Sequence, residues 1–228
     1  MPAVNNIQYS LKKSNRKTLS IYVEVDGSIS VLAPIHKTDE DINKAIESKQ
    51  LQIYRKISEL NELRESQVIR ELVNGESYLY LGRNYRLQFV DSQNVPVKLE
   101  NGYFKICRNN KLPVEQLLKK YYKEKCIQKV KERIKIYSAQ MRVEFNQLKV
   151  MELKNRWASY SPATRNINFN WKCIMAPLNV IDYIVVHELA HIKHNNHSDA
   201  FWSEVDKVIP DYRERLEWLR YNGASISI

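Results

Sequence analysis

Four of the five histidines in this chain of 228 residues lie within one short segment: His187, His191, His194 and His197. Glu188 directly follows the first of them, so the segment contains the pattern H-E-x-x-H. This pattern is typical of a helix that binds zinc through two imidazoles and carries a general base beside them. Residues four apart share one face of an α-helix, so His187 and His191 can bind one ion. Glu188 lies at the edge of that face, where it can take a proton from water without binding the metal.

A catalytic zinc ion usually has three protein ligands and keeps one position for water, so a third ligand must lie nearby. His197 is the predicted third ligand, because the turn-prone pair Asn195-Asn196 can reverse the chain after the helix and return His197 to the metal. His194 is the alternative if the helix continues. It would then lie about 4.5 Å further along the axis than the second histidine of the motif, and three imidazoles along one helix do not easily surround a tetrahedral ion. Glu204 is a more distant third option.

The composition is that of a globular protein: 43% of the residues are hydrophobic, 27% are charged, and the mean hydropathy is −0.52. No stretch approaches the roughly 18 apolar residues that cross a bilayer, so we expect no membrane partner. The first twenty residues have no apolar core of a secretory signal, and we therefore expect a cytoplasmic location. The three cysteines are Cys107, Cys126 and Cys173, and their spacing is not that of metal ligands, so reduced thiols are expected.

The net charge of +10 is concentrated in one segment, which has nine Lys or Arg residues and three Glu residues between Lys111 and Lys135. Apolar residues recur there at helical spacing, which predicts a long amphipathic helix. We favour a solvated face on a helix that packs against the core. A basic surface that attracts nucleic acid, a nucleotide or an acidic partner is the alternative, and charge alone does not decide between them.

Residues 1–110 have the pattern of a β-rich N-terminal region. Leu19, Ile21 and Val23 alternate with polar residues before Asp26-Gly27, which predicts a hairpin. Thr38 is the predicted N-cap of a helix that continues past residue 57. Four further strands are expected at Tyr78–Tyr80, Tyr85–Val90, Val95–Leu99 and Tyr103–Cys107, with a second hairpin turn at Asn101-Gly102.

Residues 111–228 differ in pattern, and we place a domain boundary near residue 110, although one compact unit is also possible. Short strands and helices alternate in this part. The expected elements are strands at Gln147–Leu153 and Ile167–Trp171 around a loop at Asn155–Arg165, a metal-binding helix from about Leu178 to Lys193 that follows Pro177, and two helices that begin at Ser198 and Asp211.

Three motifs in this part resemble those of one known family. They are Asn155-Arg-Trp-Ala-Ser-Tyr-Ser161, Asn168-Phe-Asn-Trp171, and the segment from Ala176-Pro177 through the histidines to Phe201-Trp202. The sequence resembles the YgjP-like (DUF45) zinc metallopeptidases, which are related to the WLM and SprT-like zincins. The N-terminal part agrees more loosely.

The resemblance implies an α+β fold with a zincin-like catalytic core, in which a strand of a small sheet lies beside the active-site helix. It also implies that His187, His191 and His197 bind zinc and that Glu188 is the catalytic base. The family usually has R-W-G-S-C-S where this chain has Ala158 and Tyr160. A positive φ is more costly for Ala158 than for glycine, and no role that needs a thiol carries over to Tyr160.

The predicted function is that of a zinc-dependent metallohydrolase, specifically a metallopeptidase in which Glu188 takes a proton from water. Arg156, Tyr160 and Tyr212 are candidates to stabilise the developing oxyanion, and Trp157 is a candidate to line the cleft. A peptide or protein substrate that adds as a strand to a sheet edge would suit such a site. The alternatives are a metal-dependent nucleotide phosphohydrolase and a DNA-associated protease.

Overall fold

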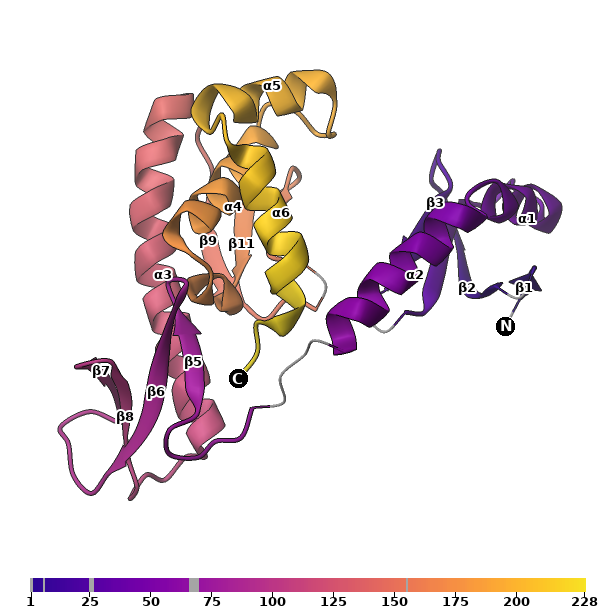
Figure 1. Cartoon of the computed structure of the whole chain (residues 1–228). Helices are drawn as coiled ribbons and strands as arrows, with labels where there is room; N and C mark the ends of the chain where they lie inside the picture. Colours follow the sequence, from indigo (N-terminus) through magenta and orange to yellow (C-terminus); the bar gives the residue numbers. More distant parts are fainter. Residues whose placement is uncertain (1, 6, 25–26, 66–69, 155) are drawn as a thin grey trace. The chain divides into compact units, whose positions relative to one another are not determined.

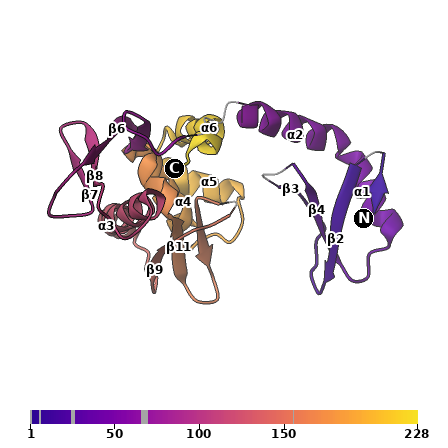
Figure 2. The ribbon, with the colours of Figure 1, turned by 90° about the horizontal axis from the view of Figure 1, so that it is seen from below.

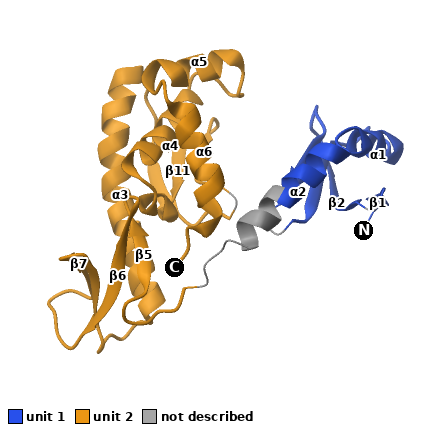
Figure 3. Ribbon diagram, viewed as in Figure 1, with its two compact units in different colours: residues 1–67 blue, residues 68–228 orange. Residues whose placement is uncertain are grey.

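The chain forms two compact units, Met1–Gln67 and Val68–Ile228, which are coloured separately in Figure 3. The computed structural model describes residues 2–5, 7–24, 27–65, 70–154 and 156–228, with the side chains of residues 59–65 outside the description. Each unit combines helices with a mixed sheet, which confirms the predicted α+β class. No helix within these ranges is long and apolar enough to cross a bilayer.

The first unit is a four-stranded sheet with two helices packed against it (Figures 1 and 2). Its elements are β1 (Ala3–Val4), β2 (Ile7–Ser14), β3 (Ser20–Val23), β4 (Ile29–Pro34), α1 (Asp39–Ser48) and α2 (Gln50–Glu65). The predicted first hairpin is present, since β3 pairs antiparallel with β4 and Gly27 has a φ of +78°. Asp26, the other predicted turn residue, lies outside the described residues.

The helix predicted after Thr38 begins as expected and then divides. The Thr38 side chain accepts a hydrogen bond from the Asp41 amide, and the Asp41 carboxylate accepts one from the Thr38 amide, which is a complete capping box. The helix pattern breaks at Lys49, where α1 ends and α2 begins. Ile46 of α1 and Ile53 of α2 are nevertheless buried in one core, and this shared core explains why the apolar pattern continues across the break.

The second unit contains another four-stranded sheet: β5 (Ser77–Tyr80), β6 (Arg83–Val90), β7 (Val97–Glu100) and β8 (Tyr103–Cys107). The second predicted hairpin is present between β7 and β8, where Asn101 has a φ of +51° and Gly102 a φ of +82°. Two successive positive φ values are what a tight turn between right-twisted strands requires, and they explain the Asn-Gly pair.

The two four-stranded sheets share one topology, although no repeat is evident in the sequence. Their strand orders are β1-β2-β4-β3 and β5-β6-β8-β7. In each sheet the two central strands are parallel and both outer pairs are antiparallel. In each of these two sheets a positive-φ glycine, Gly27 or Gly102, precedes the strand that comes last in the sequence, and a helix follows that strand.

The remaining elements of the second unit are a small sheet of order β10-β11-β9 and the helices around it. They are α3 (Val114–Met141), β9 (Leu148–Met151), β10 (Ala158–Ser161), β11 (Asn166–Asn170), η1 (Trp171–Met175), α4 (Leu178–Ala190), α5 (Asp199–Val208), α6 (Tyr212–Asn222) and η2 (Gly223–Ser225). Helix α4 packs between α3 and α6 (Figure 1). Strand β10 is at the edge of the small sheet and contacts α4. Ten residues of α4 are buried, so the helix that carries the histidines is also the centre of the core.

Helix α3 is the predicted basic helix, and several of its charges are already used within the fold. Arg133 forms a two-point ion pair with buried Asp182 of α4, with distances of 2.5 Å from Nε to Oδ1 and 2.9 Å from Nη2 to Oδ2. Lys119 pairs with Glu152 at 2.5 Å. The positive charge of this segment therefore serves partly to attach α3 to its neighbours.

The predicted boundary near residue 110 does not coincide with the division between the units, which follows Gln67. Strand β8 packs directly onto the start of α3, where Phe104 makes edge-to-face contacts with Tyr121 and Tyr122. The Tyr122 hydroxyl also donates to the Leu79 carbonyl at 2.9 Å. The change of sequence pattern at residue 110 marks a change from sheet to helix inside one core.

The turn between β5 and β6 is attached to the segment that precedes α4. The amides of Leu81 and Gly82 donate to the carbonyls of Ile174 and Met175, at 2.8 and 3.0 Å. Gly82 has a φ of +76°, and a Cβ there would lie 2.7 Å from Cγ of Pro177. Only glycine allows this close approach, so the turn supports the start of the histidine-bearing helix.

The predicted loop at Asn155–Arg165 contains a strand that the sequence pattern did not indicate. Residues Ala158–Ser161 form β10, which pairs antiparallel with β11. Its four residues, Ala-Ser-Tyr-Ser, do alternate between apolar and polar side chains, but the run is short and contains no β-branched residue, so the pattern alone does not distinguish it from a loop. Asn155 lies outside the described residues.

Candidate metal centre

Helix α4 places His187 and His191 one turn apart, as the motif predicts. The helix ends at Ala190, three residues earlier than predicted, and His191 is its C-cap residue with helical φ and ψ. The amides of Lys193 and His194 still donate to the Ala190 carbonyl, so the chain turns tightly before Asn195. This early end leaves room for the chain to reverse.

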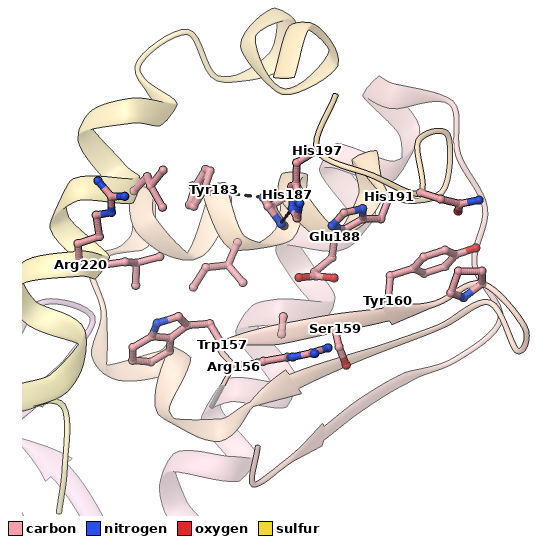
Figure 4. Close-up of a pocket in the computed structure, with 16 residues that line it drawn as sticks. Arg156, Trp157, Ser159, Tyr160, Tyr183, His187, Glu188, His191, His197 and Arg220 are labelled. Atoms are coloured by element: carbon pink, nitrogen blue, oxygen red, sulfur yellow. Dashed lines mark hydrogen bonds between the residues drawn. The ribbon is translucent and has the colours of Figure 1, made fainter. Parts of the chain in front are cut away.

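The reversal brings His197 back to the helix, while the His194 side chain stays outside the cluster. Nε2 of His197 lies 3.1 Å from Nε2 of His187 (Figure 4). One ligand atom from each of His187, His191 and His197 lies within 4.8 Å of the others. The structure thus brings together the three histidines predicted from the sequence.

This geometry fits a zinc ion. Two nitrogens that each lie about 2.0–2.1 Å from zinc at a tetrahedral angle are about 3.3 Å apart. The Nε2 atoms of His187 and His197 lie at nearly this separation, 3.1 Å, a distance that also suits an N–H···N hydrogen bond between the two neutral rings. To bind one metal ion, both Nε2 atoms must be unprotonated.

Hydrogen bonds at the Nδ1 atoms orient the imidazoles of His187 and His191. Nδ1 of His191 lies 3.1 Å from the His194 carbonyl oxygen, which can only accept, so Nδ1 carries the proton and Nε2 keeps its lone pair. Nδ1 of His187 lies 3.4 Å from the Tyr183 hydroxyl. Such partners fix the ring orientation of metal-binding histidines. His194 therefore contributes its backbone to the site.

Burial keeps the first histidine neutral. Burial, together with the neighbouring His191 and His197, lowers the pKa of His187 from 6.5 to about 3. Burial also lowers the pKa of His191, with His197 adding to the effect. A neutral imidazole is the form that binds metal, so these rings are ready to bind at physiological pH.

An aromatic side chain supports all three imidazoles. The Phe201 ring lies 5.0, 4.6 and 4.8 Å from the rings of His187, His191 and His197. Trp202 stacks on His197, with the two planes inclined by 26°. The start of α5 thus packs the imidazoles from one side and leaves the other side to the pocket.

Glu188 points from α4 toward β10 and is almost completely buried, with 6% of its surface exposed (Figure 4). Burial raises its pKa to about 7, although a hydrogen bond from the Tyr160 backbone amide and the charge of Arg156 lower it. Its Oε2 atom has no hydrogen-bond partner among the described residues. A carboxyl group with a pKa near neutrality and a free oxygen is suited to accept a proton.

Glu188 and the three clustered histidines line one pocket of about 700 Å³ between α4 and the edge strand β10. Arg156, Trp157 and Tyr160, which the sequence offered as substrate or transition-state contacts, also line it. Asn170 holds the loop that carries Arg156 and Trp157. Its side-chain Nδ2 donates to the Arg156 carbonyl at 3.3 Å, and its backbone amide donates to the Trp157 carbonyl at 2.8 Å.

Two predicted candidates lie elsewhere. Tyr212 does not line the pocket, because its ring stacks on Trp202 at 5.2 Å and is buried in the core. Glu204, the distant alternative as a ligand, pairs with Lys193 at 2.5 Å and is outside the histidine cluster. Both depend on how α5 and α6 pack, which local sequence does not reveal.

Sequence reasoning missed three residues of the site: Tyr183, Phe201 and Arg220. Tyr183 lies four residues before His187, so helical spacing alone could have found it. Phe201 lies at the end of the third motif that resembles the family, but the motif assigns it no role. Arg220 lines the pocket from the last turn of α6, and no sequence signal connects it with residues more than thirty positions away.

One known family and several solved structures resemble this chain. Curated proteins give no match. Among solved structures, the metallopeptidase zymogen abylysin of Pyrococcus abyssi is 25% identical, with a TM-score of 0.38 over 40% of this chain and 90% of its own. The metallopeptidase zymogen jannalysin of Methanocaldococcus jannaschii is 21% identical, with a TM-score of 0.37 over 40% of this chain and 92% of its own. The YgjP-like metallopeptidase domain matches residues 17–222, nearly the whole chain, and the protein therefore belongs to the YgjP-like metallopeptidase family.

Proposed function

We propose that this protein is a zinc-dependent peptidase in which His187, His191 and His197 bind the metal and Glu188 is the general base. The observation that carries the proposal is the convergence of three imidazoles beside a buried carboxyl group with a free oxygen. A zinc ion held there would polarise the scissile carbonyl and lower the pKa of a water molecule.

Glu188 would move the proton of the reaction. As the water oxygen bonds to the scissile carbonyl carbon, the carboxylate accepts one proton from that water. When the carbon–nitrogen bond breaks, the same proton passes to the leaving nitrogen, which gives one carboxylic acid and one amine. Arg156 and Tyr160 line the same pocket and are the remaining candidates to stabilise the developing negative charge.

The edge strand β10 supports a peptide as the substrate. The Trp157 carbonyl accepts from β11, whereas the Tyr160 amide donates to Glu188 on the other side. Because the backbone groups of successive strand residues alternate in direction, those of Ala158 also face the pocket. An extended peptide could pair with this edge and place one bond beside Glu188.

The first experiment is a measurement of metal content. We expect about one zinc ion per chain after purification, and we expect His197→Ala to lose far more metal affinity than His194→Ala. The second variant is a matched control, because it removes an imidazole but leaves the backbone carbonyl that bonds to His191. The reverse order of losses would contradict the assignment of the third ligand.

The second experiment tests the base. Glu188→Gln should keep its zinc and its fold but lose activity on an unstructured protein such as casein by about 10²–10⁴-fold. A loss below about tenfold is too small for a general base, and loss of zinc together with activity would make Glu188 a ligand. Turnover of nucleotides by a wild-type protein that cleaves no peptide would favour the phosphohydrolase alternative.

A further inference from the structure

The pocket beside Glu188 has a cationic lining. Of the described residues that line it, Arg156 and Arg220 are cationic and Glu188 is the one acidic residue. Arg156 acts directly on Glu188, whose pKa its charge lowers. Arg220 belongs to the last turn of α6 and lies at the end of the pocket opposite Tyr160 (Figure 4). The two arginines therefore serve different parts of the pocket.

The surroundings of Arg220 are largely apolar. Trp157, Ile184, Leu216 and Leu219 line the same pocket, and Leu219 is buried in the core. The Trp157 ring is fixed close to the chain after α6, since a Cβ at Gly223 would lie 3.0 Å from it. An ion pair formed beside such a wall is less screened than one in open water.

Arg220 is also available for a ligand. Among the described residues no carboxylate lies within ion-pair distance of it, whereas Arg215, one turn earlier on α6, pairs with Asp211 at 2.7 Å. The guanidinium offers a planar set of N–H donors that matches a carboxylate. Arg220 therefore has no ion pair among the described residues and lies beside apolar side chains at one end of the pocket. Such an arginine is suited to bind an anionic group on a substrate.

We propose that Arg220 is a specificity-determining residue that binds an acidic side chain of the peptide substrate near the scissile bond. The proposal rests on the peptidase function and names its substrate class: peptides in which a glutamate or aspartate lies close to apolar residues that contact Trp157 and Leu216. A nucleoside triphosphate fits less well. The described lining contains no lysine and no carboxylate other than Glu188, whereas triphosphate sites use several cations and carboxylate-held magnesium.

The test uses the zinc-loaded protein and a series of quenched fluorescent peptides. Each peptide has an apolar centre, and one position on either side of it carries glutamate, glutamine or lysine in turn. Arg220 is exposed in the free protein, so at one position the wild type should prefer glutamate over glutamine by about 2- to 5-fold in kcat/KM, the range of an exposed ion pair. Arg220→Gln should remove this preference, and Arg220→Glu should favour lysine instead.

A matched control comes from the same helix. Arg213 is exposed, its guanidinium lies over the Tyr212 ring, and it does not line the pocket. Arg213→Glu makes the same charge change as Arg220→Glu and should leave the glutamate preference intact. Thermal melting of each variant shows whether it is folded, since a positive charge in the last turn also stabilises a helix.

The outcomes separate this inference from the proposed function. Peptide cleavage with equal rates for glutamate and glutamine at every position would overturn the role of Arg220 and leave the peptidase function standing. A glutamate preference that persists at full size in a folded Arg220→Gln protein would also overturn it. Failure to cleave any peptide, with hydrolysis of nucleoside triphosphates, would overturn both.

Discussion

Replacing Glu188 by glutamine should stabilise the metal-free protein at neutral and alkaline pH. The carboxyl group is buried, and burial raises its pKa to about 7 from an ordinary value of 4.5. The folded protein therefore keeps this proton up to a higher pH than the unfolded chain. Ionising the buried group costs free energy that glutamine, which has no proton to lose, does not incur.

The magnitude follows from the two pKa values. Because the folded-state pKa is raised, the associated stability is fully present below pH 4.5 and is lost as the pH rises through 7. At about 1.4 kcal/mol per pH unit, this interval corresponds to about 3 kcal/mol. The stability of Glu188→Gln relative to the wild type should thus increase by about 3 kcal/mol between pH 4.5 and pH 8.5.

The assay is urea unfolding of metal-stripped proteins across this pH range, followed by tryptophan fluorescence. Glu217→Gln is the matched control, because Glu217 is an exposed glutamate of α6, and its relative stability should not vary with pH in this way. A difference for Glu188→Gln that stays flat from pH 4.5 to 8.5 would refute the reasoning. It would mean that neighbouring groups stabilise the carboxylate as well as water does.

Three further predictions concern the fold around the site. Gly82→Ala should lower the free energy of unfolding by about 1–3 kcal/mol more than Gly102→Ala, because both residues have positive φ but only a Cβ at Gly82 meets a neighbour, at 2.7 Å; equal losses in urea unfolding would contradict this. Asp182→Ala should cost about 2–3 kcal/mol in the same assay, because it leaves the largely buried Arg133 guanidinium with only the Tyr137 hydroxyl at 3.4 Å and Glu132 at 3.9 Å, and a loss below about 1 kcal/mol would show that the pair is not needed. Burial raises the pKa of Cys126 to about 12 and that of Cys173 well above its usual value, so thiol reagents at pH 8 should label both only after unfolding, and rapid labelling of the native protein would contradict their burial.

The sequence predicted the parts of the site that depend on local geometry. His187, Glu188 and His191 follow from helical spacing, and the turn-prone residues after α4 predicted that His197 rather than His194 lies beside them. Each of these inferences concerns residues within about three turns of one helix, where spacing along the chain determines position in space.

The parts that the sequence missed depend on contacts between distant elements. Strand β10 is only four residues long and has no β-branched residue, so its identity as a strand comes from pairing with β11. Tyr212 and Arg220 lie on one helix, and the packing of α6 against α4 decides that Arg220 faces the pocket and Tyr212 the core. The chain divides after Gln67 and not near residue 110 for the same reason, since Phe104 and Tyr122 share a core on either side of residue 110.

The turn at Leu81-Gly82 limits how far the protein can be shortened. A fragment that began at residue 111 would keep all four clustered histidines, yet it would leave the carbonyls of Ile174 and Met175 without their donors. It would also uncover the Tyr122 ring of α3, which Phe104 contacts. The smallest piece of this chain that keeps the site intact should therefore include the β5–β8 sheet. Insertions in the β5–β6 turn should disturb the histidine cluster, although no residue of that turn lines the pocket.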